Sequence, residues 1–339
     1  MSVIDVKIGY SGLSHLGLIH AVAVAHKGAQ VVAKDNSKHK VSDLKKNKID
    51  IEEPNLHKLL KSGQKHLQFT TNSDELAKCE IVFISLDVPT DNVGVSDLNL
   101  IHENLDQTLA SLNKDAVLVI LSQVPPGFTR KIKKRHTDIE IYYQVETLIF
   151  GQAIHRALNP ERFIIGCADR NKNLNLNYYK FLDSFNCPIL PMTYESAELT
   201  KISINAFLAS SVSMSNTLSE ISEIVGADWF EIIPALRLDN RIGPHSYLNP
   251  GLGLSGGNLE RDLKTLIQIG EKEGSNVASV RAILENSEHQ KNWLWRTFTE
   301  TRISQVYGSK IAILGLSYKE NTSSTKNSPA VHFILKLSN

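Results

Sequence analysis

The stretch "VKIGYSGLSHLGLIHAVAVAHKGAQVVAKD", residues 6–35, decides the fold. A β-rich run leads to a glycine turn, a helical run follows, and a second β-rich run ends at Asp35. Gly12, Ser14 and Gly17 occupy the places of the glycines in a G-x-G-x-x-G turn. Such a turn brings backbone N–H groups and a helix N-terminus to a pyrophosphate, and the acid can hold a ribose hydroxyl. The unit therefore predicts dinucleotide binding rather than an ordinary strand–helix turn.

Beyond this unit the chain divides into three zones. Residues 1–190 alternate β-rich and helical runs, which indicates a doubly wound parallel sheet covered by helices. The β-rich runs are residues 6–12, 29–35, 79–86, 116–123, 139–145 and 162–167. Residues 196–300 lack strand signals and have helical periodicity, with a glycine stop at Gly226. Residues 309–324 resume the strand-then-loop pattern, so we expect one more strand and helix at the end of the chain.

The composition excludes several classes of protein. A net charge of +1 gives no reason to expect binding to nucleic acid or to an anionic membrane. No apolar run approaches the ~20 residues that span a bilayer. The three cysteines are scattered and read as reduced cytoplasmic thiols. The twelve histidines form no ligand cluster, so we expect no metal site.

Further motifs stand in order along the chain. They are "KIDIEEPNLHKLL" at 48–60, "SQVPPGFT" at 122–129, "VETLIFGQAIHRALNPERFIIG" at 145–166, "ESAELTKISINAFLA" at 195–209, "RIGPHSYLNPGLGLSGGNLERD" at 241–262 and "GLSYKENTSSTKNSPA" at 315–330. Together with the first unit, these motifs resemble those of the UDP-glucose/GDP-mannose dehydrogenase family, the nucleotide-sugar 6-dehydrogenases. The resemblance covers residues 6–331.

The resemblance implies an architecture and a chemistry. It implies a Rossmann-like NAD-binding domain at 1–194, a helical central domain with a dimer contact at 195–304, and the truncated start of a nucleotide-sugar-binding domain at 305–339. Members of the family oxidise a sugar 6-hydroxymethyl group to a carboxylate with NAD as the only cofactor, and a cysteine thiolate captures the intermediate aldehyde. We therefore expect a nucleotide-sugar substrate, with a UDP-sugar favoured, and a homodimer.

The resemblance also implies roles for single residues. Glu146 matches the glutamate that activates water for thioester hydrolysis. Lys201 and Asn205 match a catalytic lysine and asparagine, and four-residue spacing on a helix gives them one face. Asp262 matches an aspartate that helps accept the alcohol proton, although an acid in the first turn of a helix also suits the helix dipole. The expected cofactor-binding residues are Gly12, Ser14, His15, Leu16, Asp35, Lys40, Val88, Pro89 and Gln123. The expected substrate-binding residues are Thr147, Leu148, Arg241, Tyr247, Leu248, Gly253 and Lys319.

Several positions depart from the family pattern. Asn258 stands where the family has its nucleophilic cysteine, and an amide is no nucleophile at neutral pH. Asn258 is instead a favoured N-cap for a helix that begins at Leu259. Ser14 replaces a glycine, and Asp87 adds an anion close to the expected pyrophosphate position.

These departures leave three hypotheses open. The chain is a dehydrogenase limited to the two-electron step, or a non-catalytic relative that binds a ligand or pairs with a full-length paralogue, or a degenerate product whose fold survives.

Overall fold

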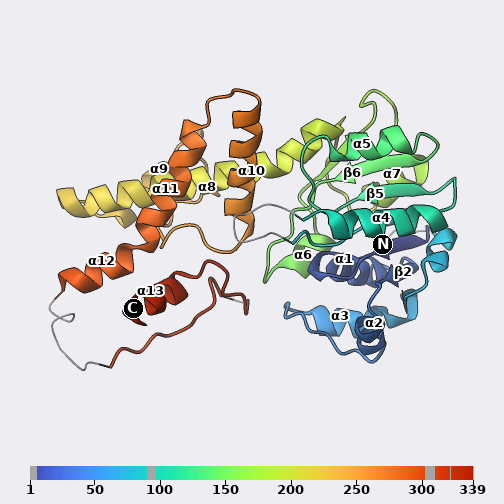
Figure 1. Cartoon of the computed structure of the whole chain (residues 1–339), viewed down its shortest axis with the longest axis horizontal. Helices are drawn as coiled ribbons and strands as arrows, with labels where there is room; N and C mark the ends of the chain where they lie inside the picture. The colour runs from blue at the N-terminus through green and yellow to red at the C-terminus, as the bar shows by residue number, and fades with distance from the viewer. Residues whose placement is uncertain (1–5, 90–96, 302–309, 321, 339) are drawn as a thin grey trace. The chain divides into compact units, whose positions relative to one another are not determined.

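A computed structural model gives the structure of residues 6–89, 97–301, 310–320 and 322–338. The described residues form two compact units, and the boundary falls inside one long helix, between Lys201 and Ile202. Figure 1 shows the sheet of the first unit in blue to green and the helices of the second unit in yellow to red. The chain is thus an α/β unit followed by a helical unit.

An eight-stranded sheet forms the centre of the first unit, in the order β3-β2-β1-β4-β5-β6-β7-β8. Its strands are β1 (Ile8–Ser11), β2 (Val31–Lys34), β3 (Leu67–Thr70), β4 (Ile81–Ile84), β5 (Val117–Ile120), β6 (Glu140–Gln144), β7 (Phe163–Cys167) and β8 (Ile189–Thr193). The predicted doubly wound Rossmann-like sheet is confirmed, and each of the six predicted runs contains a strand.

The sheet is mostly rather than wholly parallel, because β6 and β7 run antiparallel. These two strands are connected through α6 (Ala153–Leu158), a helix of six residues. The chain therefore re-enters the sheet from the edge at which it left.

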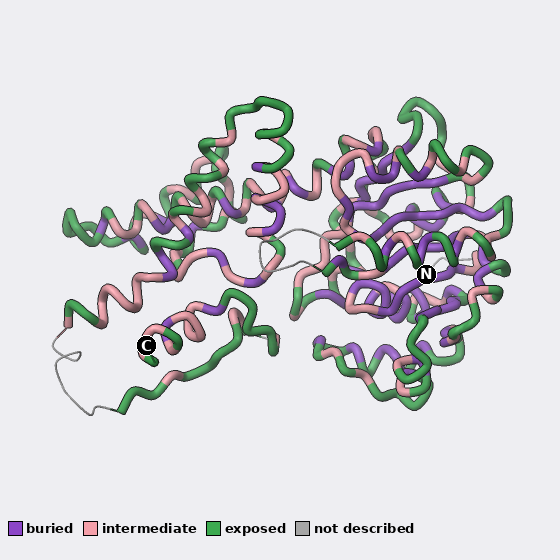
Figure 2. The backbone as a smooth tube through the Cα atoms, viewed as in Figure 1, coloured by how far each residue is buried: buried purple, intermediate pink, exposed green. Residues whose placement is uncertain are grey.

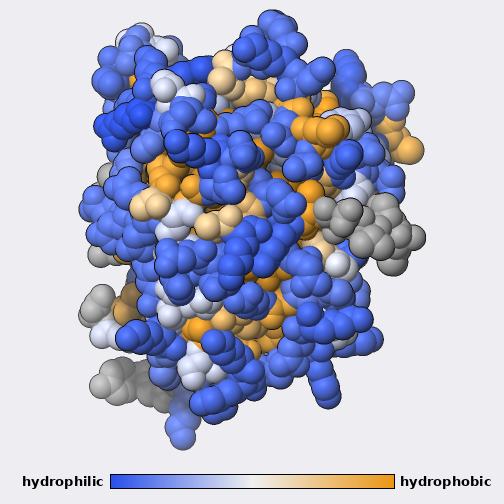
Figure 3. Space-filling view, turned by 90° about the vertical axis from the view of Figure 1, so that its right-hand side faces the viewer, coloured by the Kyte–Doolittle hydropathy of each residue, from blue (hydrophilic) through white to orange (hydrophobic). Residues whose placement is uncertain are grey.

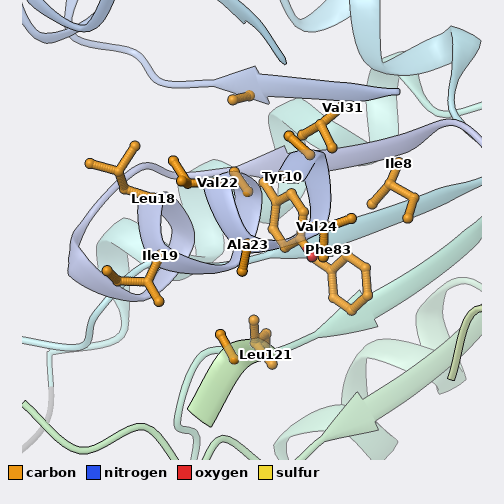
Figure 4. Close-up of a cluster of buried hydrophobic side chains, with 14 of the residues drawn as sticks. Ile8, Tyr10, Leu18, Ile19, Val22, Ala23, Val24, Val31, Phe83 and Leu121 are labelled. Carbon is orange, nitrogen blue, oxygen red and sulfur yellow. The ribbon is translucent and has the colours of Figure 1, made fainter. Parts of the chain in front are cut away.

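Helices cover both faces of the sheet in the first unit. They are α1 (His15–His26), α2 (Lys38–Lys45), α3 (Leu56–Gly63), α4 (Asn99–Ser111), α5 (Phe128–Arg135), α7 (Leu176–Asp183) and the short 3-10 helices η1 (Gln64–His66) and η2 (Ser73–Lys78), besides α6. Alternate residues of a strand face opposite sides of the sheet. Ile8 and Tyr10 therefore pack in the core beneath α1, as Figure 4 shows. Ser11 faces the other side, where its Oγ accepts a hydrogen bond from Thr108 Oγ1 of α4 at 2.9 Å.

The sequence did not reveal the two edge strands, β3 and β8. Strands covered on both faces, such as β1 and β4, are wholly buried and give continuous apolar runs. In β3 Leu67 and Phe69 are buried, Gln68 is exposed and Thr70 is half-buried, and β8 contains no fully buried residue. Figure 2 shows the same contrast, with buried residues concentrated in the middle of the sheet.

The second unit is helical, as predicted. It contains most of α8 (Tyr194–Val225), followed by α9 (Trp229–Leu238), α10 (Asn258–Lys272), α11 (Ala278–Lys291), α12 (Trp293–Glu300) and α13 (Pro329–Ser338). Gly226 ends α8 with a φ of +75°, a conformation that glycine adopts without strain. A small core of Ala209, Leu254 and Leu263 joins α8 to α10.

The strand expected within residues 309–324 is not found in the described part of that segment. Residues 310–316 form no strand, and Leu314 is 96% exposed. A strand needs a hydrogen-bonded neighbour, and none of the described residues of the second unit is in a strand. The expected helix does form, as α13.

Among the residues that the structure describes, no helix is long and apolar enough to cross a bilayer. In Figure 3 hydrophilic side chains predominate on the face shown, and hydrophobic ones form smaller groups between them.

Candidate active site

The carboxyl ends of five parallel strands place the predicted residues of the first unit at one edge of the sheet. The chain runs outward from β1 to β2 on one side and from β4 to β5 on the other. In open α/β sheets, ligands bind outside the carboxyl ends of the strands at such a switch point. Gly12, Asp35, Asp87, Gln123 and Glu146 all follow strands that end at this edge.

The turn between β1 and α1 requires its glycines. Gly12 has a φ of +99°, and a Cβ atom there would lie 2.4 Å from Leu86 Cγ. A Cβ atom on Gly17 would lie 1.9 Å from the carbonyl oxygen of Gly12. Both positions therefore exclude a side chain, and they allow the turn to pack closely against α1 and the loop after β4.

Asp35 and Lys40 both contact this turn. The Asp35 carboxylate accepts hydrogen bonds from Leu13 N and from Ser37 N, each at 2.9 Å. Lys40 Nζ donates to the carbonyl oxygen of Leu13 at 3.1 Å. The structure therefore brings the expected ribose-binding acid and the lysine to opposite sides of one turn residue.

The loop after β4 lies against the same turn. Asp87 N donates to Ser14 Oγ at 2.8 Å, and the Asp87 carboxylate accepts from Leu16 N at 3.3 Å. In the same loop Val88 is buried and Pro89 is exposed. Gln123, in the loop after β5, is half-buried.

Glu146 lies two residues beyond β6, with 14% of its side chain exposed. Its carboxylate accepts hydrogen bonds from His20 Nε2, at 2.5 Å, and from Leu148 N. Burial alone raises the pKa of Glu146, but the charge and hydrogen bond of His20, together with Lys201, outweigh burial and hold that pKa below its usual range. The structure thus brings Glu146 and Lys201 within electrostatic reach of one another.

Glu53 and His20 are site residues that sequence reasoning missed. Glu53 accepts hydrogen bonds from His15 Nε2, Gly151 N and Ala153 N at 2.9, 2.9 and 3.2 Å. It therefore ties the start of α1 to the segment that follows Glu146. Glu53 lies inside the motif at residues 48–60, so its position in that motif could have identified it as a site residue. No feature of the sequence indicated that His20 contacts Glu146.

In the second unit, Asn205, Arg261 and Asp262 form a buried cluster. Asn205 Nδ2 of α8 donates to Asp262 Oδ2 at 2.5 Å, and Arg261 Nε donates to Asp262 Oδ1 at 3.0 Å. All three residues are less than a tenth exposed. The two donors balance the cost of burying the Asp262 carboxylate and fix its orientation.

The glycine-rich loop before α10 is held by two polar side chains. Asn216 Oδ1 accepts from Gly251 N at 2.7 Å, and Ser287 Oγ accepts from Leu254 N at 2.8 Å. Gly253 has a φ of +81°, and a Cβ atom there would lie 2.5 Å from the carbonyl oxygen of Ser287. The loop conformation therefore depends on this glycine.

The prediction that Asn258 caps a helix beginning at Leu259 is wrong. The helix α10 begins at Asn258 itself, the N-cap is Gly257, and no side chain caps the helix. Gly257 allows the helix to start one residue earlier, so the Asn258 side chain is exposed in the first turn.

All three cysteines lie in the first unit, and none lies in the loop before α10. Cys79 and Cys167 are buried, and burial raises the pKa of the Cys79 thiol to about 12. These thiols are therefore not poised to act as nucleophiles.

The expected substrate-binding residues have varied surroundings. Arg241 is exposed and pairs with Asp239, whereas Leu248 is buried against Trp229. Tyr247 is exposed, and its carbonyl oxygen accepts a hydrogen bond from Ser215 Oγ. Thr147 is half-buried, and its carbonyl oxygen accepts a hydrogen bond from Arg156 Nε. The ammonium group of Lys319 lies over the Tyr318 ring.

Comparison with known proteins gives consistent matches. Residues 6–181 match the model of the UDP-glucose/GDP-mannose dehydrogenase family, NAD binding domain, and residues 195–289 match that of the central domain. The chain is 30% identical over 338 residues to UDP-glucose 6-dehydrogenase TuaD of Bacillus subtilis, covering 97% of the chain and 72% of the relative. It is 28% identical to UDP-glucose 6-dehydrogenase of Rickettsia bellii, covering 98% of the chain and 78% of the relative.

The fold matches a solved structure as well. The structure of a UDP-glucose dehydrogenase from Pyrobaculum islandicum superposes with a TM-score of 0.87 at 27% identity. That match covers 98% of the chain and 79% of the solved chain.

Proposed function

This chain belongs to the UDP-glucose/GDP-mannose dehydrogenase family, residues 6–181 form its NAD-binding domain, and from this premise we propose that it oxidises the 6-hydroxymethyl group of a nucleotide-sugar, a UDP-sugar being favoured. We propose further that it stops at the two-electron step. The observation that supports this limit is the exposed amide of Asn258 at the start of α10, four residues before the buried Asp262.

The residues at the turn fit NAD. Gly12 and Gly17 allow the tight packing of turn and helix that brings the N-terminus of α1 to the end of β1, and Asp35 lies at the end of β2, where a ribose hydroxyl would be held. When bound, NAD supplies a hydride acceptor for the sugar C6. The protein must orient the sugar alcohol and remove its proton.

In the second unit, Asp262 has the role of accepting that proton, directly or through water. Asn205 and Arg261 each donate a hydrogen bond to its carboxylate and fix the orientation of that carboxylate. Loss of the hydroxyl proton and of a hydride from C6 converts the alcohol to an aldehyde, with NADH and one proton as the other products. Asn258 has no nucleophilic atom that could bond to that aldehyde, so no thioester follows.

The experiment is incubation of the full chain with NAD and a panel of UDP- and GDP-sugars, with NADH followed by absorbance and the sugar product by mass spectrometry. We expect an aldehyde or its hydrate and one NADH for each sugar oxidised. Formation of the sugar acid with two NADH would refute the two-electron limit. If no sugar of the panel gave NADH, the dehydrogenase proposal would be refuted.

A non-catalytic relative is the second candidate, and a specific contact favours it. Ser14 and Asp87 are bonded to each other in the turn where NAD must bind. A protein that binds NAD or a nucleotide-sugar tightly, with no turnover of any sugar, would support this candidate, including pairing with a full-length paralogue.

We also propose that the chain forms a homodimer through α8. Five exposed apolar residues follow one another along this helix at spacings of seven, four, three and four: Phe207, Met214, Leu218, Ile221 and Val225. This spacing places them on one face, as in helices that pack against a partner helix. Phe207 and Met214 also line a groove of about 600 Å³ between α8 and α11. A second copy would cover this face.

We place the protein in the cytoplasm, because its three cysteines are all free. Reduced thiols are typical of that compartment.

A further inference from the structure

In the first turn of α1, one of the backbone N–H groups that a pyrophosphate would use already has a partner. At a helix N-terminus the first N–H groups have no partner within the helix and attract anions. In this chain Leu16 N already donates to the Asp87 carboxylate, at 3.3 Å. An anion from the protein itself therefore occupies part of the position that the turn offers to a phosphate.

A series of hydrogen bonds holds Asp87 in this place. Asp87 N donates to Ser14 Oγ at 2.8 Å, and Ser14 Oγ donates to the carbonyl oxygen of Ser85 at 3.3 Å. Ser85 Oγ in turn donates to the carbonyl oxygen of Gly12 at 2.9 Å. The loop after β4 is thus bonded to the turn by these three hydrogen bonds, and Ser14 and Asp87, which both depart from the family pattern, contact each other.

The charge of Asp87 is not balanced by an ion pair with any side chain that the structure describes. The nearby cation Lys40 contacts Leu13 on the side of Asp35. A pyrophosphate that entered the turn would lose the Leu16 donor to Asp87 and would meet a like charge there. Like charges at close range oppose binding even where solvent screens them.

We propose that Asp87 is a specificity-determining residue, an internal competitor for the pyrophosphate position that weakens the binding of phosphate-bearing ligands and leaves nucleoside binding intact. This inference rests on the proposed dinucleotide site. Adenosine reaches the side of Asp35 without a phosphate, whereas ADP and NAD must displace the Asp87 carboxylate from Leu16 N.

The test is isothermal titration of the full chain and of Asp87→Asn with NAD, ADP and adenosine. The Asn variant keeps the size of the side chain and an oxygen acceptor and removes the charge. We expect NAD and ADP to bind about tenfold more tightly to the variant. We expect adenosine affinity to change by less than about twofold.

Asp115→Asn is the matched control. Asp115 is an exposed aspartate that precedes β5, at the opposite edge of the sheet from the turn, so its loss should leave all three affinities unchanged. Asp87→Ser removes the same charge should the Asn variant fail to fold.

Unchanged or weaker NAD and ADP binding by the variants would overturn the inference, as would an equal gain for adenosine. If unmodified protein still binds and reduces NAD in that case, the proposed function stands. If neither the unmodified protein nor the variants bind NAD or adenosine, both proposals fall.

Discussion

The side chain of Asn258 decides whether this protein can bind an aldehyde intermediate covalently. It is exposed at the start of α10, one turn before the buried Asp262. An amide at this position can hydrogen-bond to a sugar, but it forms no covalent bond to an aldehyde.

The substitution Asn258→Cys should restore covalent capture. A thiolate in the first turn of α10 is favoured by the positive end of the helix dipole, which lowers the pKa of a thiol there. We expect the product to change from aldehyde to acid and the NADH yield to rise from one to two per sugar, measured by absorbance and mass spectrometry. Asn258→Ser is the control, and an unchanged aldehyde product from the Cys variant would contradict the prediction.

Glu146 should make the stability of the fold dependent on acid pH. Its folded pKa lies below the ordinary 4.5. A carboxyl group with a depressed folded pKa stabilises the protein above its unfolded pKa, and this contribution is lost as pH falls through the folded pKa. We expect Glu146→Gln to lower the free energy of unfolding by about 1–3 kcal/mol at pH 7.

The same variant should flatten the fall in stability below pH 4.5, the ordinary pKa of this group. Urea unfolding at a series of pH values measures both effects. Glu103→Gln, at an exposed site on α4, is the control. Parallel pH profiles for Glu146→Gln and the unmodified protein would argue against the role of the ion pair.

At this scale the sequence indicated which residues gather but not how they are bonded. Gly12, Asp35 and Glu146 were predicted because motif and strand end coincide at each of them. His20 was missed because its partner is 126 residues away, and only folding brings the two together. Asn258 was assigned a cap role because its residue type favours that position, but Gly257 took the position instead.

At the scale of elements, α5 depends on a carboxylate from another helix. Gly127 N and Thr129 N, at the start of α5, donate to the two oxygens of Glu198 at 2.5 and 2.8 Å. Glu198 is fully buried in the first turns of α8, and burial raises its pKa, in part against these bonds. The two N–H groups have no partner within α5, so α8 completes the start of α5.

The substitution Glu198→Gln should therefore destabilise the first unit. An amide can accept with one oxygen only and would point N–H groups at the other donor, which we expect to cost about 1–3 kcal/mol in urea unfolding. Glu195→Gln is the matched control on the same helix. Glu195 pairs with Arg130 in a solvent-accessible position, and such pairs contribute about 0–1 kcal/mol. Equal effects of the two substitutions would contradict this account.

Buried strands were easier to predict from the sequence than strands at the edges of the sheet. The central strands, covered on both faces, left apolar runs in the sequence, whereas β3 and β8 at the edges did not. Residues 310–316 show the opposite case, because their apolar run predicts a strand that cannot form without a neighbour. Whether a segment forms a strand thus depends on the neighbouring strands that can pair with it as well as on its own residues.

For the molecule as a whole, the apolar face of α8 predicts self-association. Phe207 and Met214 are 79% and 60% exposed on the single chain. Large apolar side chains that are exposed together on one helix face are typical of a surface that binds a partner. We expect the unmodified protein to be a dimer by light scattering coupled to gel filtration. The variant Met214→Glu should be monomeric at the same concentration, because a charge would be buried in the interface.

Glu223→Lys, an exposed change about half a turn from Ile221, is the control and should leave the dimer intact. A monomeric unmodified protein, or a Met214→Glu variant that remains dimeric, would refute the proposed interface.

The three hydrogen bonds accepted by Glu53 have a consequence for protein engineering. Because one carboxylate joins His15 to the backbone at Gly151 and Ala153, the first helix and the Glu146 segment cannot be exchanged as independent modules. A chimaera that grafts residues 145–153 onto another dinucleotide-binding scaffold would have to bring the loop around Glu53 with them. Natural variation faces the same constraint, so these three segments should change together or not at all.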